Sequence, residues 1–528
     1  MPLEMVDDPQ DSQDYNDNSG SSGSSGRGGG GAGGLLNFLP LLLTLFSGGG
    51  KGGGGKKIFI ILIVVVAGYF LMNNKSCSPA VSNVISQFTT GGRLDPNQFK
   101  KAKVYEGLED DNTKNPLPEM VSLLKFAPDR MNQGKQGSCV AWSSAYAARS
   151  IIESASTASN PNSVAFSPAF MYNQIGLDGC QGSYIIRAME FMTDKGAVPF
   201  NDFPYNDQDC SKQPDSRQWS DAQQNKMHGF NRLTEDDGVK NINIRAIKEH
   251  LAKDAPVVIG MMVGGTFMQD MMGQKVWHPT DEDFNQMGFG GHALCVIGYD
   301  DRMEGGAFQI MNSWGNDWGQ NGIAYVRYAD FKSFVREAYG LDPMTKRGAA
   351  LNIDFECTIG LINNETKQNI PLHAGFGNNF TTTQPVTKGT KFKIEINNAV
   401  ECYIYLFTPN VQGSSFVLFP YKPAHSAYCG ITGTRLFPRK ESIRADSIGT
   451  KDFMAVVVSK QALDYNAMNA AINNSSQSTY AGKLNEAIGN AAIKNVRFSN
   501  TDKGALYFKT AATEKNNIVG CVVEINKQ

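Results

Sequence analysis

The sequence predicts an α+β protein of several domains, preceded by a low-complexity N-terminal region. Apolar residues recur at helical spacing from Val140 to Ile152, and apolar strands such as His292 to Tyr299 follow. Short strands then fill the chain from Leu351 onward, with a single helical insert. A chain of 528 residues is long enough for about two to four separate hydrophobic cores.

The first 115 residues differ in composition from the rest. Residues 1–55 are rich in Gly and Ser, which cannot bury enough apolar surface to order a chain, so we expect a disordered tail. Residues 56–73 contain an apolar run from Ile58 to Met72 that directly follows two lysines. This run fits a signal-peptide core or an uncleaved transmembrane signal anchor. Since no good cleavage site follows, we favour the anchor, and we expect residues 74–115 to form a polar tether.

The distribution of charged residues indicates how the chain is oriented in a membrane and argues against a nucleic-acid partner. The lysines before the apolar run favour a cytoplasmic N-terminus, with everything after Lys75 outside the cytoplasm. The net charge of −2 includes no basic block in the folded part, so no nucleic-acid partner is expected. The nine cysteines include no CxxC pair, and HExxH is absent, so we expect neither a metal site nor a cofactor.

Cys139 stands where a Gly-rich turn, 133–137, leads into a predicted helix. A cysteine beside an apolar helix is most often a small buried hydrophobe. The N-terminus of a helix favours negative charge, however, and a thiol placed there has a lowered pKa and is a better nucleophile. A catalytic role would also require a base elsewhere in the chain.

His292 is the best candidate for that base. It follows two glycines that allow another backbone to approach closely, and it begins an apolar strand. After the next strand comes Asn312, which can orient the imidazole, and then Trp314, which can shield their hydrogen bond from water. We expect the other five histidines to be solvated or isolated, with His250 on the polar side of a helix: His228, His250, His278, His373 and His425.

With these motifs in this order, residues 116–345 resemble a papain-like cysteine peptidase. The segment "QGKQGSCVAW" resembles the part of that family that carries the oxyanion donor and the nucleophile, which implies these roles for Gln133 and Cys139. "GGHALCVIGY" resembles the segment of the catalytic histidine, His292, and "NSWGNDWGQNG" that of the orienting Asn312. The resemblance implies a two-lobe fold, with a helical left lobe and a β-barrel-like right lobe.

The same resemblance implies a substrate site and a disulfide. "CQGSY", from Cys180, resembles the loop whose backbone pairs with an extended substrate. Gln136 stands where the family usually has a cysteine, so its usual disulfide is absent and we expect Cys180 to pair with Cys210 instead. The expected substrate-binding residues are Gly182, Ser183, Gly291 and Trp314.

Substrate preference and activation are less defined. The pocket that usually selects the substrate would be built partly from residues 257–265, which suggest a small or apolar pocket. A helical inhibitory pro-segment does not fit into the short tether. The enzyme is therefore either active without removal of a pro-domain or silenced in another way.

Residues 351–528 are predicted to form a mostly β, sandwich-like domain. The pair of strands around "TPNVQG" predicts a hairpin with Gly413 in the turn, and residues 461–492 predict a helical insert. The run "KFKIEINNAVECYIYLFTPNVQGSSFVLFP" resembles a domain of unknown function at the C-terminal end of bacterial peptidases, which implies a bacterial owner. Its ligand is not predicted.

The leading hypothesis is a single-pass membrane protein with an extracytoplasmic catalytic domain, periplasmic or on the cell surface. It would be a cysteine endopeptidase that acts on peptides or proteins through a Cys–His–Asn set. One alternative is a non-hydrolytic envelope protein that uses the same fold for binding or assembly. Another is a transpeptidase or an amidase that uses the same catalytic set. The set Cys139, His292, Asn312 and Gln133 argues against a pure binder, which has no need of all four.

Overall fold

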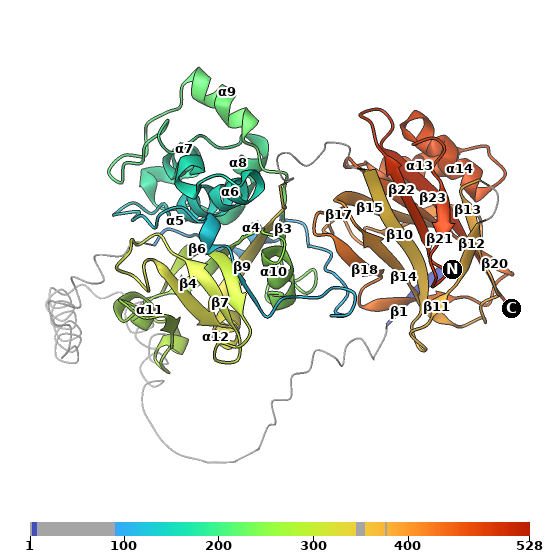
Figure 1. The fold of residues 1–528 in the computed structure, drawn as a ribbon, viewed down its shortest axis with the longest axis horizontal. Helices are drawn as coiled ribbons and strands as arrows, with labels where there is room; N and C mark the ends of the chain where they lie inside the picture. The colour runs from blue at the N-terminus through green and yellow to red at the C-terminus, as the bar shows by residue number, and fades with distance from the viewer. Residues whose placement is uncertain (1–2, 8–89, 345–353, 375–376) are drawn as a thin grey trace, which may run out of the picture. The chain divides into compact units, whose positions relative to one another are not determined.

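The computed structural model describes residues 3–7, 90–344, 354–374 and 377–528. Residues 90–344 form an α+β part, and residues 354–528 form a β-rich part (Figure 1). Within these ranges no helix has the length and apolar character needed to cross a bilayer, and the predicted anchor from Ile58 to Met72 lies outside them.

Helices make up most of the chain between residues 139 and 224. α5 (Cys139–Ala141), the π-helix η3 (Trp142–Arg149) and α6 (Ser150–Thr157) follow one another without a break. Nearly all their side chains are buried, as the apolar spacing predicted, and α7 and α8 pack against η3. The remaining helical elements of this region are η4 (Pro161–Val164), α7 (Pro168–Ile175), η5 (Asp178–Cys180), α8 (Ile185–Asp194) and α9 (Ser216–Gln224).

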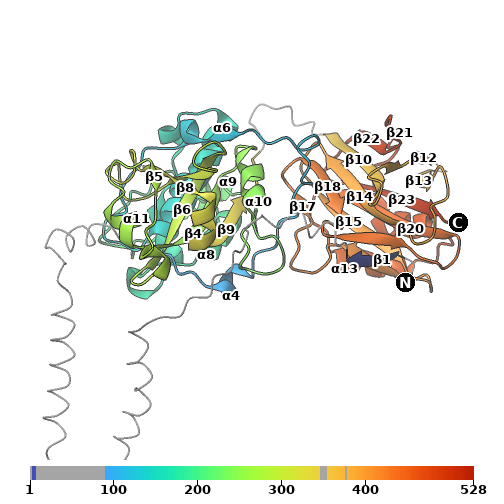
Figure 2. The same ribbon diagram turned by 90° about the horizontal axis from the view of Figure 1, so that it is seen from below.

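The second half of this part is an eight-stranded, mostly antiparallel sheet in the order β3-β9-β4-β6-β7-β8-β5, with β2 paired to β6. Among the described strands, the two edge strands β3 and β5 do not pair with each other. The lobe predicted to be barrel-like is therefore an open sheet. β4 and β6 lie near the middle of this sheet (Figure 2). Both strands are almost wholly buried. The strands are β2 (Met120–Ser122), β3 (Phe230–Arg232), β4 (Val257–Val263), β5 (Val276–Trp277), β6 (Gly290–Asp300), β7 (Ala307–Met311), β8 (Ile323–Arg327) and β9 (Val335–Leu341), and the helices beside them are η2 (Leu124–Phe126), α10 (Ile244–Leu251), α11 (Gly265–Gln269), η6 (Asp283–Asn285) and α12 (Tyr328–Phe334).

The prediction of a polar tether is wrong for residues 90–115. They include the helix α4 (Pro96–Phe99). Asp95 caps its N-terminus, and the Asp95 side chain accepts a hydrogen bond from the backbone N–H of Asn97. Phe99 is fully buried and meets the ring of Tyr339 edge-on at 5.0 Å. Tyr105 is also buried and lies 3.1 Å from a carboxylate oxygen of Glu249. A few apolar side chains therefore fix a segment whose composition is mostly polar.

The C-terminal part is a sandwich of two sheets, as predicted. One sheet has the order β1-β19-β14-β10-β22-β21, with β11 on β10 and β18 on β14; the other has the order β12-β13-β23-β20-β15-β16, with β17 on β15. A common core fills the space between them, with Ile394 and Phe437 from one sheet and Leu406 and Val456 from the other. The strands are β10 (Asp354–Asn363), β11 (Asn369–Ile370), β12 (Leu372–Ala374), β13 (Asn379–Thr382), β14 (Lys391–Asn398), β15 (Cys402–Pro409), β16 (Ser415–Phe419), β17 (Tyr428–Cys429), β18 (Gly433–Phe437), β19 (Glu441–Ala445), β20 (Lys451–Ser459), β21 (Phe498–Asn500), β22 (Leu506–Ala511) and β23 (Ile518–Asn526).

Two helices cover the outer face of the second sheet. Alternate residues of β15 point to opposite faces, so Leu406 enters the core between the sheets while Phe407 faces the helices. The helices are α13 (Tyr465–Asn474) and α14 (Tyr480–Ile488), followed by η7 (Gly489–Ala491) (Figure 1). They confirm the predicted helical insert, and the β15–β16 pairing confirms the predicted hairpin.

Three further expectations are wrong. Within the tail predicted to be disordered, β1 (Leu3–Asp7) pairs antiparallel with β19 over five residues, and Met5 packs on the sandwich core. His250, predicted to be solvated, is fully buried with its Nδ1 2.7 Å from Ala246 O. His425, predicted to be an isolated surface residue, has its Nε2 2.6 Å from Asp237 Oδ1. The hydrogen-bond partners of His250 and His425 could not be predicted from the residues next to them in the sequence.

We expect Ile394→Ala to destabilise the C-terminal sandwich by about 3 kcal/mol, because it opens a cavity in a fully buried position of β14. Hydrogen exchange of the β10 and β14 amides in urea would measure the change in opening free energy. Ile448→Ala is the matched control, since Ile448 is 52% exposed and its truncation should change that free energy by less than about 0.5 kcal/mol. Equal effects of the two substitutions would contradict the assigned core.

Candidate active site

Cys139 is the first residue of α5, and it is fully buried. The backbone N–H of Ala293, which follows His292 on β6, donates to Cys139 Sγ at 3.4 Å. The start of α5 and the start of β6 are therefore in contact. Two residues that lie far apart in the sequence, Cys139 and His292, are brought to one place by this contact.

The imidazole of His292 is oriented by Asn312, which follows β7. His292 Nε2 lies 2.8 Å from Asn312 Oδ1, and the same oxygen accepts the backbone N–H of Ser313 at 2.8 Å. An amide oxygen only accepts, so the Nε2 atom carries the proton. The other nitrogen, Nδ1, is then an acceptor, and it is buried with no hydrogen-bond partner in the described part of the chain. His292 thus has the tautomer that a base at Nδ1 requires.

Trp314 covers this pair of residues. Its ring stacks on the imidazole of His292 with the ring centres 4.4 Å apart and the planes inclined by 25°. The Trp314 side chain is 1% exposed, so it excludes water from one face of the imidazole. Predicted both as a shield and as a substrate-binding residue, Trp314 lies in the position of a shield.

Gln133 is held beside the site through Ser313. The Ser313 hydroxyl donates to Gln133 Oε1 at 2.6 Å, and the Gln133 backbone N–H donates to Ser313 O at 2.8 Å. Gln133 Nε2 donates to Gln136 O at 3.0 Å, which leaves its second hydrogen for another acceptor. The sequence analysis did not identify Ser313 as a site residue. Its position between Asn312 and Trp314 could have indicated that it lies in the site.

The chain's own residues 90–93 cover the candidate site. The Gly92 N–H donates to Gly291 O at 3.0 Å, and the Arg93 N–H donates to Ser183 O at 2.9 Å. Ser183 N–H in turn donates to Gly91 O at 2.9 Å, which completes a parallel bridge between Gly92 and Ser183. Ser183 and Gly291 were both predicted to bind substrate, so this segment occupies the backbone positions expected for a peptide.

The segment presents N–H groups to the sulfur of Cys139. Burial raises the pKa of the Cys139 thiol to about 11, although the N–H groups of Ala293, Gly91, Val140 and Gly92 act in the opposite direction. Burial likewise lowers the pKa of His292 to about 4, partly opposed by its bond to Asn312. Thiol and imidazole are therefore both neutral near pH 7 in this state. The lowered thiol pKa expected from the helix start is outweighed by desolvation.

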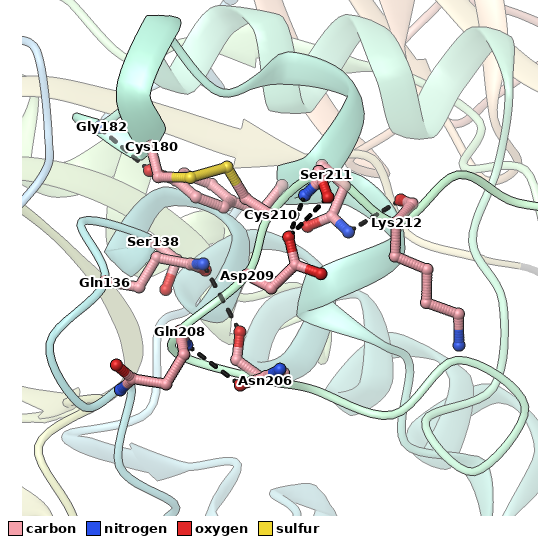
Figure 3. The surroundings of a disulfide bond; sticks show 12 residues. Gln136, Ser138, Cys180, Gly182, Asn206, Gln208, Asp209, Cys210, Ser211 and Lys212 are labelled. Atoms are coloured by element: carbon pink, nitrogen blue, oxygen red, sulfur yellow. Dashed lines mark hydrogen bonds between the residues drawn. A yellow bond between two sulfur atoms is a disulfide. The ribbon is translucent and has the colours of Figure 1, made fainter.

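A disulfide joins Cys180 to Cys210 (Figure 3). It holds the loop that leads to Ser183, with which residues 91–93 pair. Gly182, two residues beyond Cys180, has a φ of 103° and donates its N–H to Tyr172 Oη at 3.0 Å. A methyl group at Gly182 would lie 2.2 Å from Gly91 O, so a glycine is required for this close approach. In the described ranges no group of His, Cys, Asp and Glu is arranged to hold a metal ion.

Residues 126–339 match the family model described as papain family cysteine protease. The chain is 25% identical to cathepsin K of Mus musculus over 249 residues, which are 46% of this chain and 69% of that protein. It is 28% identical over 241 residues to a cathepsin L-like proteinase of Phaedon cochleariae, with coverage of 44% and 68%. Among solved structures, a cysteine protease of Xylella fastidiosa, xylellain, is 23% identical with a TM-score of 0.37, covering 48% of this chain and 98% of that chain.

We expect Gly91→Ala to expose Cys139, because the added methyl group would lie 2.1 Å from Gly137 O and the segment must move away. Release of the segment should lower the thiol pKa from about 11 and raise the rate of alkylation by iodoacetamide at pH 8 on the order of 100-fold. Mass spectrometry of Cys139 at a series of pH values would measure both changes.

The control for this experiment is Asn97→Ala, an exposed position in α4 just beyond the segment, which should leave the alkylation rate unchanged. Rapid alkylation of Cys139 in the unsubstituted protein, equal to that of Gly91→Ala, would show that residues 90–93 do not protect the thiol.

Proposed function

Because residues 126–339 are a papain-family cysteine protease domain, we propose that this chain is a cysteine endopeptidase that is latent until residues 90–93 leave its active site. The observation that carries the proposal is the hydrogen-bonded set of His292 and Asn312 beside Cys139, with Gln133 held at its edge by Ser313. The substrate is a peptide or a protein.

Catalysis begins with transfer of the Cys139 proton to His292 Nδ1. The sulfur then attacks the carbonyl carbon of the scissile peptide bond, and the tetrahedral intermediate collapses when His292 donates the proton to the leaving amine. The product of this step is a thioester between Cys139 and the acyl part of the substrate. Water, deprotonated by His292, hydrolyses the thioester and restores the thiol.

Two donors are suited to the oxyanion of the intermediate: the second Nε2 hydrogen of Gln133 and the backbone N–H of Cys139. The bond from Ser313 fixes the side chain of Gln133 before substrate arrives, so little reorganisation is needed as negative charge develops. Loss of one such donor costs about 3 kcal/mol in the activation barrier.

Latency follows from what the segment does to the nucleophile. It fills the positions at which a peptide would pair with Ser183 and Gly291, and it keeps the thiol and the imidazole dehydrated and neutral. The N–H groups of Gly91 and Gly92 face the sulfur, and an N–H group is not a target for a nucleophile. Removal of a helical pro-domain is not needed to explain such silencing.

Two rival functions use the same site. A transpeptidase or an amidase would form the same thioester but pass the acyl group to an amine, or take it from a non-protein amide. A non-hydrolytic binding protein would need neither the selected tautomer of His292 nor the fixed side chain of Gln133, so these two features favour chemistry over binding. Product analysis with and without an added amine separates hydrolysis from transfer.

We propose further that the catalytic domain works outside the cytoplasm and is attached to a membrane by the run from Ile58 to Met72. The disulfide between Cys180 and Cys210 supports an oxidising compartment. The apolar run supports attachment by its composition alone.

Cys139→Ala should abolish peptide hydrolysis, by at least about 1000-fold in kcat/KM, because the Cys139 sulfur forms the thioester in the proposed mechanism. The measurement compares cleavage of a peptide library in the Gly91→Ala background, where the site is open. Cys295→Ala is the matched control, since Cys295 is a buried cysteine on the same strand as His292 and should retain activity. Activity near normal without the Cys139 thiol would exclude it as the nucleophile.

Val65→Arg should release the full chain from membranes, since a charge at the centre of an apolar span costs about 3 kcal/mol. Fractionation of cells with alkaline carbonate would measure the membrane-bound share. Ser82→Arg, beyond the apolar run, should change nothing. Complete extraction of the unsubstituted chain by carbonate would contradict the anchor.

A further inference from the structure

Four buried cysteines lie in the core of the C-terminal sandwich: Cys357 on β10, Cys402 on β15, Cys429 on β17 and Cys521 on β23. All four are free thiols in this structure. Cys402 and Cys429 stand directly opposite each other in the antiparallel pair of β15 and β17. No other two cysteines of the described strands are register partners, so the register selects one pair of the four.

The spacing of Cys402 and Cys429 lies within the reach of a disulfide. The Ile404 N–H donates to Ala427 O at 3.0 Å, and these two residues lie two positions along the strands from the cysteines. Because hydrogen-bonded and non-hydrogen-bonded pairs alternate in an antiparallel ladder, the two cysteines form a hydrogen-bonded pair, with Cα atoms about 5.5 Å apart. Disulfides join cysteines whose Cα atoms are about 4.4 to 6.8 Å apart. Both side chains face the core between the sheets.

The same pairing would keep the bond under strain. The Cβ atoms of directly opposite residues are about 4.5 to 5.5 Å apart, and hydrogen-bonded pairs have the wider spacing, whereas a relaxed disulfide has about 3.8 Å. Closing the bond therefore requires β17 to move toward β15. β17 is only two residues long, so this shift disturbs few hydrogen bonds. A strained disulfide is more easily reduced than a relaxed one.

A buried guanidinium lies beside the two thiols. Arg435 on β18 is fully buried, and in the described part of the chain it forms no ion pair. Its Nη1 donates to Asn398 Oδ1 at 2.7 Å, and Asn398 Nδ2 donates to the backbone oxygen of Cys429 at 2.9 Å. Burial raises the pKa of both thiols, and the charge of Arg435 acts in the opposite direction on each. A fixed positive charge favours the thiolate, which is the reactive form in disulfide exchange.

We propose that Cys402 and Cys429 are a reversible disulfide pair, closed by exchange with a small-molecule or protein disulfide in an oxidising compartment. The thiolate of one cysteine attacks a sulfur of that disulfide and releases the other sulfur as a thiolate. The second cysteine then attacks the resulting mixed disulfide and releases the remaining thiolate. The two protons of the cysteines pass to the released thiolates, so one disulfide is reduced for each one formed. The inference does not depend on the proposed peptidase function.

The bond would fix the segment between β16 and β18, in which β17 is the only strand. This segment holds Val104, which follows the covering residues 90–93 in the chain. The Val104 N–H donates to Ala424 O at 2.7 Å, and the Ser426 N–H donates to Val104 O at 2.9 Å. Oxidation would therefore strengthen one attachment of the chain that leads to the active site, and reduction would loosen it.

Mapping of disulfides in the full chain tests the pair directly. The protein is equilibrated in buffers with an increasing ratio of reduced to oxidised glutathione, quenched with acid, alkylated in denaturant and digested without reduction. Mass spectrometry should find the Cys402 peptide linked to the Cys429 peptide under oxidising conditions. This link should be half reduced at a ratio at least about tenfold lower than the link between Cys180 and Cys210, which lie outside any strand, so that no ladder fixes their spacing.

Cys521→Ala is the matched control, since Cys521 lies in the same core but is the register partner of a valine, and it should leave the link unchanged. Cys402→Ala should leave Cys429 alkylated at every ratio. Separate alkylated peptides of Cys402 and Cys429 under all oxidising conditions, or a link from either one to Cys357 or Cys521, would overturn the proposal. A link as resistant to reduction as that of Cys180 would overturn its reversibility.

Hydrogen exchange measures what the bond does to the segment. The amide of Ser426 should exchange at least about fivefold more slowly in the oxidised protein than in the reduced protein, because the bond limits local opening around β17. Cys402→Ala provides a reference that stays reduced, and its Ser426 amide should exchange equally fast in both buffers. Equal rates in the oxidised and reduced forms of the unsubstituted protein would show that the bond does not fix this segment.

Discussion

The burial of Cys139 beneath residues 90–93 depends on backbone hydrogen bonds between this segment and two other residues, Ser183 and Gly291. Three hydrogen bonds fix the segment over the helix start that carries Cys139. Because the pairing involves main-chain groups and glycines, nothing larger than a hydrogen atom projects toward the thiol from Gly91 and Gly92. The disulfide at Cys180 stabilises the loop on which this pairing is built.

Desolvation links the position of the segment to the chemistry of the site. A helix start and neighbouring N–H groups favour a thiolate, but they do not overcome complete burial of Cys139. The same burial keeps His292 neutral, so neither Cys139 nor His292 carries a charge near pH 7, although the hydrogen bond between His292 and Asn312 is in place. Access of water to this site therefore sets the pKa values of the Cys139 thiol and the His292 imidazole.

The sequence was most informative where side-chain chemistry determines local structure. The Cys139, His292 and Asn312 segments could be singled out because each combines a reactive group with glycines or a strand end. The docking of residues 90–93 could not be foreseen, since backbone hydrogen bonds leave no side-chain pattern in the sequence. Glu337 was missed for a related reason: it is an acidic residue in a buried strand, and only the fold brings its carboxylate to the backbone N–H of Asp95.

The pairing of β1 with β19 restricts how the chain can be threaded through a bilayer. Strands exchange hydrogen bonds only on the same side of a membrane, so residues 3–7 and the C-terminal sandwich share one compartment whenever this pair is formed. A single crossing between them would separate the two strands. In the paired state the intervening chain must therefore cross an even number of times or not at all, and a protein with one crossing must give up β1.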